Sequence, residues 1–208
     1  MIKNSYLALG LVSVLLVGGC SHDDDGHDHD QMHAPQLKAV GDHTVVVNRD
    51  IEIQLSALDE AGHQHNWIAE GVSGKPNPFE HTTPAVFDTS AGLFSWTATD
   101  APLDSYLVRF SVADAQDSAA HDEEIVEIKV ITPLQNGERI ATTICSGCHG
   151  ASLDGVGSWG PKIFNKTSEQ IEFMRTEGPG PMKTNAVVKS LSSEDIEDVA
   201  SYLATLGS

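Results

Sequence analysis

The feature that most constrains this chain is a five-residue run in its last third, Cys145-Ser146-Gly147-Cys148-His149. Two thiols separated by two residues and followed at once by an imidazole can hold a haem, because the thiols add across its vinyl groups and the histidine ligates iron. A structural zinc site needs about four ligands, yet from Pro133 onward there is no third cysteine and no second histidine. A redox-active thiol pair remains the alternative, although such pairs normally occur in a βαβ setting.

The second iron ligand is sought among the soft donors that follow His149, which are Met174 and Met182. Met174 shares one helical face with Ile171, and core packing explains that position. Met182 follows a stretch rich in glycine and proline, Glu177 to Pro181, from which a shaped loop can present a thioether. The pattern favours Met182 and leaves Met174 as the alternative.

Residues 134–208 resemble the class I c-type cytochromes through the Cys145 to His149 run, Gly160-Pro161, the Gly178 to Met182 loop and a closing helix after Leu191. The resemblance implies one haem c, attached through thioethers to Cys145 and Cys148. It further implies axial bonds from His149 and Met182, and a Pro161 carbonyl that accepts the other imidazole N–H. One departure is Lys183, where the family commonly has proline after the ligand methionine.

A segment of this length rarely stabilises a fold with its own side chains alone, so a cofactor is expected to complete its core. Three helices are predicted: from about Asn136 to Ser146, from a Thr167 cap to Gly178, and after a Ser192 cap with Asp195 at the third helical position. The resemblance implies a small all-α domain in which the first helix crosses the last. The expected contacts are Gly137, Ile140 and Ala141 against Val199, Tyr202 and Leu203.

The amino terminus has the pattern of an export signal. Lys3 precedes an apolar run from Tyr6 to Val17, which is too short to span a bilayer of roughly 30 Å as a helix. The following Val17-Gly18-Gly19-Cys20 resembles the lipobox of bacterial lipoproteins. It implies that residues 1–19 are removed, that Cys20 is acylated, and that the protein is anchored to a membrane facing the periplasm, with the outer membrane favoured. An ordinary secretory signal is the alternative.

Residues 20–35 are rich in histidine and aspartate and lack the apolar content needed for a core. We expect a disordered tether. Its imidazoles and carboxylates could also collect a transition metal.

Residues 36–132 alternate apolar and polar side chains, which predicts an all-β sandwich. Trp96 and Tyr106 lie in alternating patterns and are predicted core residues. The stretches 89–98 and 106–114 resemble immunoglobulin-like, cadherin-like modules of bacterial surface proteins. The expected strands are Thr44 to Asn48, Ile51 to Leu58, His65 to Ala69, Ala85 to Asp88, Leu93 to Ala98, Ser105 to Val112 and Glu124 to Thr132.

Charge limits the partners of this chain. Its 12 basic residues face 30 acidic ones, a formal net charge of −18, which excludes nucleic acid as a natural partner. A redox partner with a basic patch around its own centre is expected. Lys162, Lys166 and Lys183 are candidate cations around the haem edge, and Trp159 is a candidate neighbour of a propionate.

These features predict a multidomain, membrane-tethered electron carrier rather than an enzyme: an all-β immunoglobulin-like sandwich followed by a small all-α cytochrome c domain. Two ligands on iron favour electron transfer over catalysis. One alternative is a haem peroxidase or small-molecule reductase with an open iron site. The other is an adhesion or interaction protein in which the haem senses redox state.

Overall fold

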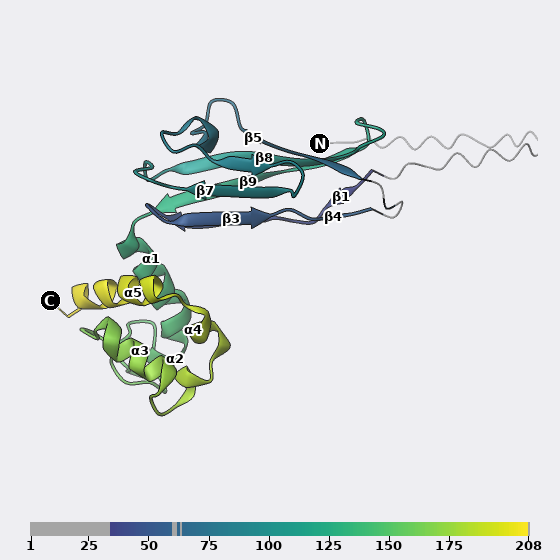
Figure 1. Cartoon of the computed structure of the whole chain (residues 1–208). Helices are drawn as coiled ribbons and strands as arrows, with labels where there is room; N and C mark the ends of the chain where they lie inside the picture. Colours follow the sequence, from purple (N-terminus) through teal and green to yellow (C-terminus); the bar gives the residue numbers. More distant parts are fainter. Residues whose placement is uncertain (1–33, 60–61, 63, 208) are drawn as a thin grey trace, which may run out of the picture. The chain divides into compact units, whose positions relative to one another are not determined.

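The computed structural model describes residues 34–59, 62 and 64–207 (Figure 1). Within these residues, nine β-strands precede Thr132 and all α-helices follow it. The predicted signal segment, Cys20 and most of the predicted tether lie outside the described residues. In the part that is described, no helix combines the length and the apolar character that crossing a membrane requires.

The strands form two main sheets and one short pair. The first sheet has the order β2 (His43–Val46), β9 (His121–Ile131), β8 (Ser105–Asp114) and β5 (His65–Gly71). The second has the order β3 (Asp50–Gln54), β7 (Leu93–Thr97) and β6 (Val86–Asp88), and β1 (Gln36–Leu37) pairs with β4 (Ala57–Leu58). Neighbouring strands are antiparallel except β2 and β9, which are parallel.

Aromatic side chains join the two main sheets across a buried core. Phe94 of β7 meets Phe110 of β8 edge to face with ring centroids 5.6 Å apart, and Trp96 meets Tyr106 at 4.9 Å. Each of the four is at most 2% exposed. Edge-to-face pairs suit the charge distribution of aromatic rings. The predicted sandwich and the predicted core positions of Trp96 and Tyr106 are confirmed, and Figure 1 shows the two layers.

The expected strands differ from the observed ones mainly at their ends. The predicted strand from Ile51 to Leu58 is interrupted, because β3 pairs with β7 as far as Gln54 while Ala57 and Leu58 pair with β1. Strand β9 begins at His121 rather than Glu124, since its ladder with β8 continues to Ala113. Strand ends are set by the neighbour that supplies the hydrogen bonds, which the alternation of one segment does not reveal.

The helical part begins directly after β9. Thr132 caps α1 (Pro133–Ile140) in a reciprocal pair with Gln135, so this helix starts three residues before the expected Asn136. Proline suits the first turn, where its missing N–H costs no helical hydrogen bond. A π-helical turn (Ala141–Cys145) and α2 (Ser146–His149) continue it.

Two further helix starts were predicted correctly. Thr167 with Gln170 caps α3 (Ser168–Thr176), and Ser192 with Asp195 caps α5 (Ser193–Thr205). The short α4 (Ala186–Ser190), capped by Asn185, was not predicted, because five residues are too few to show helical periodicity.

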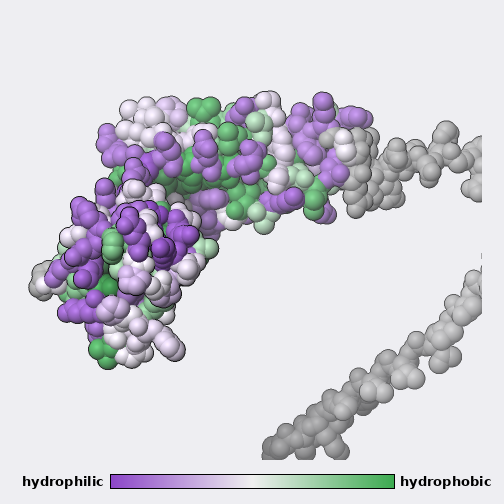
Figure 2. Space-filling view, turned by 60° about the horizontal axis from the view of Figure 1, so that its bottom comes forward, coloured by the Kyte–Doolittle hydropathy of each residue, from purple (hydrophilic) through white to green (hydrophobic). Residues whose placement is uncertain are grey.

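Helices α1 and α5 pack together as the resemblance implied. Ile140 and Ala141 share a buried cluster with Val199 and Leu203, with Tyr202 against its edge. Figure 2 shows hydrophilic residues over most of the surface of the helices, while hydrophobic residues gather along a band of the β module.

An arginine that sequence reasoning missed contacts α5 from the turn between β2 and β3. The two guanidinium nitrogens of Arg49 each lie 2.8 Å from an oxygen of Asp198. The Asn136 amide donates to the same carboxylate at 2.8 Å and to Asp195 at 2.9 Å. Because the Asp198 side chain is only 4% exposed, these donors replace the water that its charge would otherwise need.

Candidate functional site

One helical segment carries both thiols and the imidazole of the run from Cys145 to His149. Cys145 ends the π-helical turn, while Cys148 and His149 belong to α2. Residues three and four apart lie on the same face of a helix, so the three side chains are presented together. Gly150, with φ of 82°, ends the segment in a conformation that favours glycine.

The helix changes its winding just before the thiols. The hydroxyls of Thr142, Thr143 and Ser146 each donate to the carbonyl four residues earlier, at 2.6 to 2.8 Å. Such bonds bend helices, and single π-helical turns are frequent at functional sites.

The ring of His149 is held in one orientation. Its Nδ1 lies 2.6 Å from the Pro161 carbonyl, and the residue is 8% exposed. Because a carbonyl can only accept a hydrogen bond, Nδ1 is the donor in this contact, and in the neutral ring the lone pair is then on Nε2. Gly160 lies against the ring, where an added Cβ would come 2.6 Å from Nδ1. This is the orientation that a metal-binding histidine takes when its other nitrogen is tied to the protein.

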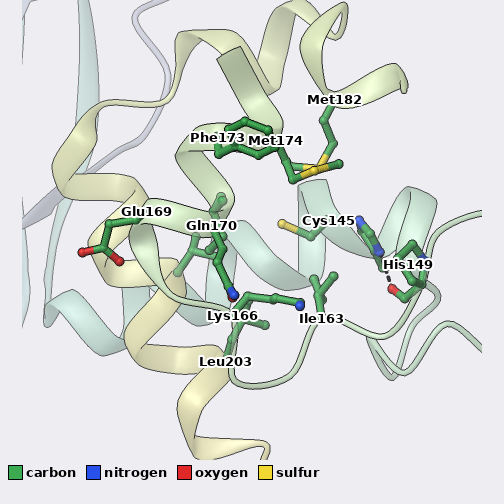
Figure 3. Close-up of a pocket in the computed structure, with 13 residues that line it drawn as sticks. Cys145, His149, Ile163, Lys166, Glu169, Gln170, Phe173, Met174, Met182 and Leu203 are labelled. Atoms are coloured by element: carbon green, nitrogen blue, oxygen red, sulfur yellow. Dashed lines mark hydrogen bonds between the residues drawn. The ribbon is translucent and has the colours of Figure 1, made fainter. Parts of the chain in front are cut away.

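A cavity of about 500 Å³ adjoins His149 and Cys145 (Figure 3). Its lining is mostly apolar, and a smaller space of about 50 Å³ continues it toward Cys148. A cavity of this size and character suits a flat apolar cofactor with few polar groups. The shared lining of the two spaces consists of Cys145, His149, Ile171, Met182 and Val199.

Both candidate methionines face this cavity. Met182 lies in a 3-10 turn (Pro181–Lys183) and lines both spaces, whereas Met174 of α3 lines the larger one alone. Figure 3 shows their thioethers side by side, facing the part of the cavity that Cys145 and His149 line. Core packing therefore describes Met174 incompletely, because its side chain reaches the candidate site.

The end of α4, which follows the Met182 turn, is held by an arginine that sequence reasoning did not single out. From α3, Arg175 donates to the carbonyls of Lys189 at 3.0 Å and Leu191 at 2.9 Å. Its other nitrogens bond Glu172. The Pro181 carbonyl accepts from the backbone of Thr184 and Asn185. The turn thus forms with Lys183 in the place where the family commonly has proline.

Burial raises the pKa of the Cys145 thiol to about 11, with a smaller contribution from Cys148. Cysteines that exchange disulfides have lowered pKa values, because the thiolate is the reacting form. Burial therefore disfavours Cys145 as the attacking thiol of a redox-active pair. The described residues also contain no cluster of three or more histidine, cysteine, aspartate or glutamate side chains arranged to hold a metal ion.

The candidate cations and Trp159 have separate positions. Lys166 lines the larger cavity, whereas Lys162 lies over the Phe164 ring with its nitrogen 4.3 Å from the centroid. Lys183 is in the Met182 turn but does not line either space. Trp159 is 99% exposed and contributes to neither lining, and its expected place beside a propionate stays a prediction.

The fold and the site together define a small helical domain built around an apolar cavity, with two thiols, an oriented imidazole and a thioether on its walls. Residues 132–203 match the model of the family described as cytochrome C oxidase, cbb3-type, subunit III. This segment therefore carries a cytochrome c-type domain, which suggests haem-based electron transfer. No curated protein matches the chain.

Solved structures resemble the chain over about half of its length. Tandem Ig repeats of Dlar are 10% identical with a TM-score of 0.34, over 49% of this chain and 50% of that one. The protocadherin GammaB4 extracellular domain is 17% identical with a TM-score of 0.34 (48% and 17%), and the insect immune protein hemolin 16% with 0.33 (53% and 26%). The chain thus spans at most half the length of these three neighbours. The chain's own two main sheets define the sandwich, and the finer immunoglobulin-like topology stays a prediction.

Proposed function

We propose that this protein is a one-electron carrier whose helical domain holds a single haem c. Thioether bonds to Cys145 and Cys148 would attach the group, with His149 and Met182 as axial ligands. The observation that carries the proposal is the His149 ring, which is fixed through Nδ1 to Pro161 and keeps Nε2 for a metal beside an apolar cavity. When bound, haem supplies an iron that gains and loses one electron.

The chain's own residues fit this cofactor in three respects. The cavity walls exclude water through side chains such as Ile163, Ile171 and Leu203. The Pro161 carbonyl keeps the proton on Nδ1 and strengthens the imidazole as a ligand. The hydrogen bonds to the Pro181 carbonyl close the turn of Met182, and the Arg175 contacts tie α3 to the end of α4, which follows that turn.

Two protein ligands on iron would leave no open position for a substrate, which favours electron transfer over haem catalysis. Among the described residues that line the two spaces, His149 is the one imidazole, and arginine does not occur. An open-site peroxidase would use such groups around its substrate. Among the described residues, we find no feature that favours the alternative of an adhesion or interaction protein with a redox-sensing haem.

We also propose that the protein is exported and anchored through an acylated Cys20, facing the periplasm. The support is the apolar segment before Val17-Gly18-Gly19-Cys20. Metabolic labelling with palmitate should label the wild-type chain and leave Cys20→Ser unlabelled. The helical segment 134–208 has 6 basic and 9 acidic residues, so a partner with a basic docking patch fits it.

The cofactor is tested on full-length protein from cells with the haem-attachment machinery. We expect a mass increase of one haem that survives denaturation, and no such increase in a Cys145→Ser, Cys148→Ser double variant. Colourless wild-type protein would overturn the proposal.

The axial ligand is tested with a matched pair of methionine variants. Met182→Ala should abolish the weak absorption at the red end of the visible spectrum that marks methionine on ferric iron, and should permit rapid carbon monoxide binding. Met174→Ala, which removes the neighbouring thioether, should keep that band. The reverse result would assign the ligand to Met174.

A further inference from the structure

The two ends of the cavity differ chemically. Cys148 lines only the smaller space, whereas Cys145 lines both spaces. At the larger space the lining gains three polar side chains that the smaller one lacks: Lys166, Glu169 and Gln170. An apolar cavity thus has its thiols toward one end and a polar group of residues toward the other.

We propose that Lys166 and Gln170 form a carboxylate-binding end of this cavity and hold the propionates of the haem. The inference rests on the proposed function and adds to it the residues that recognise the charged edge of the cofactor. In a haem the two vinyl groups and the two propionates occupy opposite edges of the ring. With the vinyl edge attached to Cys145 and Cys148, the propionates fall at the end away from the thiols.

Gln170 has its amide oriented by its second role as a helix cap. The backbone N–H of Thr167 donates to Gln170 Oε1 at 3.3 Å, so the oxygen of the amide is already in use. The Nε2 group is left as a donor, and it has no hydrogen-bond acceptor among the residues that the structure describes. Figure 3 shows this nitrogen directed into the cavity.

Lys166 precedes the Thr167 cap and is held through its backbone. Its N–H donates to the Ile163 carbonyl at 3.3 Å, and Asn165, with φ of 57°, turns the chain here while its own N–H bonds the Leu203 carbonyl. In Figure 3 the amine of Lys166 extends into the cavity. Within the described chain this amine lies in no ion pair.

The third polar residue, Glu169, is compatible with a carboxylate-binding end formed by Lys166 and Gln170. In Figure 3 the Glu169 carboxylate points away from Lys166 and Gln170. A carboxylate brought to the edge of an apolar cavity loses hydration and needs a donor or a cation in exchange. Lys166 and Gln170, which are both exposed, supply one cation and one neutral donor at an end of the cavity that is open to solvent.

This assignment predicts an effect on the reduction potential. A cation beside the propionates offsets negative charge near the iron, and removing it makes the ferric state easier to keep. Lys166→Gln should therefore shift the midpoint potential downward, and Lys166→Arg should restore most of the shift. Gln170→Glu keeps an oxygen for the Thr167 cap while removing the amide donor and adding a negative charge, so it should shift the potential in the same direction.

The control is Lys162→Gln, which removes the same charge from a lysine of the same segment that lies over Phe164. Full-length protein with one haem by mass is titrated potentiometrically, and the propionate bending bands are followed by resonance Raman spectroscopy. We expect Lys166→Gln to lower the potential and shift these bands, with a clearly smaller change for Lys162→Gln. Equal shifts in both variants, or no shift for Lys166→Gln, would overturn the inference. If the protein still carries one haem, the proposed function is unaffected by that result. Colourless wild-type protein would overturn both the inference and the proposed function.

Discussion

Gly137 of α1 lies directly against the backbone carbonyl of Asp198 in α5. A Cβ built on Gly137 would overlap that oxygen and come 3.0 Å from the Val199 nitrogen. Backbone atoms cannot move aside as a flexible side chain can. The close crossing of the first and last helices therefore depends on a residue without a side chain.

Gly137→Ala should lower the free energy of unfolding of the helical domain by about 1–3 kcal/mol, the usual cost of overpacking. Denaturant unfolding followed by circular dichroism measures this change. Glu138→Ala, at an exposed position of the same helix, is the matched control and should change stability little. A Gly137→Ala protein as stable as the wild type would show that the helices can separate without cost.

Arg49→Ala removes the guanidinium that neutralises Asp198 and leaves its buried carboxylate with Asn136 alone. Removing one partner of a fully buried pair costs about 3–5 kcal/mol. Because 22% of the Arg49 side chain is exposed, we expect a smaller loss of about 2–3 kcal/mol. Thermal and denaturant unfolding report it.

The control for Arg49 is Arg109→Ala, which breaks more exposed pairs with Glu70 and Glu123. Such pairs contribute about 0–1 kcal/mol. In an Asp198→Asn background, Arg49→Ala should cost much less than it does alone. Equal costs in both backgrounds would mean that the two residues do not act together.

Asp195 makes the stability of α5 depend on pH. Burial raises the pKa of its carboxyl. This effect is outweighed by hydrogen bonds from the Ser192 backbone, the Asn136 amide and the Ser192 hydroxyl and by the charge of Arg49. The pKa of Asp195 is therefore lowered from its ordinary value of 3.8. The charged form is thus favoured in the folded state. Its contribution is complete above about pH 4 and is lost as the pH falls through the lowered pKa.

Asp195→Asn should therefore lower stability at pH 7 by about 1 kcal/mol, the usual value of a helix cap, and should reduce the loss of stability on acidification. Glu197→Gln changes the same charge at an exposed position of α5 and should keep the wild-type acid response. Unfolding curves from about pH 3 to 7 provide the test. Parallel acid curves for wild type and Asp195→Asn would contradict it.

Gly160→Ala should disturb the imidazole of His149. The added Cβ would lie 2.6 Å from Nδ1 and 2.7 Å from Cε1, so the ring must turn away from the Pro161 carbonyl. We expect a shifted midpoint potential or lower haem content, measured by redox titration and by haem absorbance per protein. The control is Gly147→Ala, whose added Cβ meets open space and should leave both values unchanged.

Much of this protein was predictable from local sequence. The run from Cys145 to His149 and the two capping pairs, Thr167 with Gln170 and Ser192 with Asp195, depend on residues a few positions apart, so they can be found without knowing the fold. The alternation around Trp96 and Tyr106 likewise indicated a sandwich, because a strand with one buried face alternates apolar and polar side chains.

The tertiary structure decided what depends on segments far apart in the chain. Arg49 reaches Asp198 across 149 positions, and no local pattern marks that pair. Met174 and Lys166 become candidate site residues only because the folded chain places them in the lining of the same cavity as Cys145. The sequence by itself determined which chemistry the helical segment can carry, because the bonding groups are adjacent. Only packing decided which side chains surround that chemistry, because burial and charge pairing are properties of the folded chain.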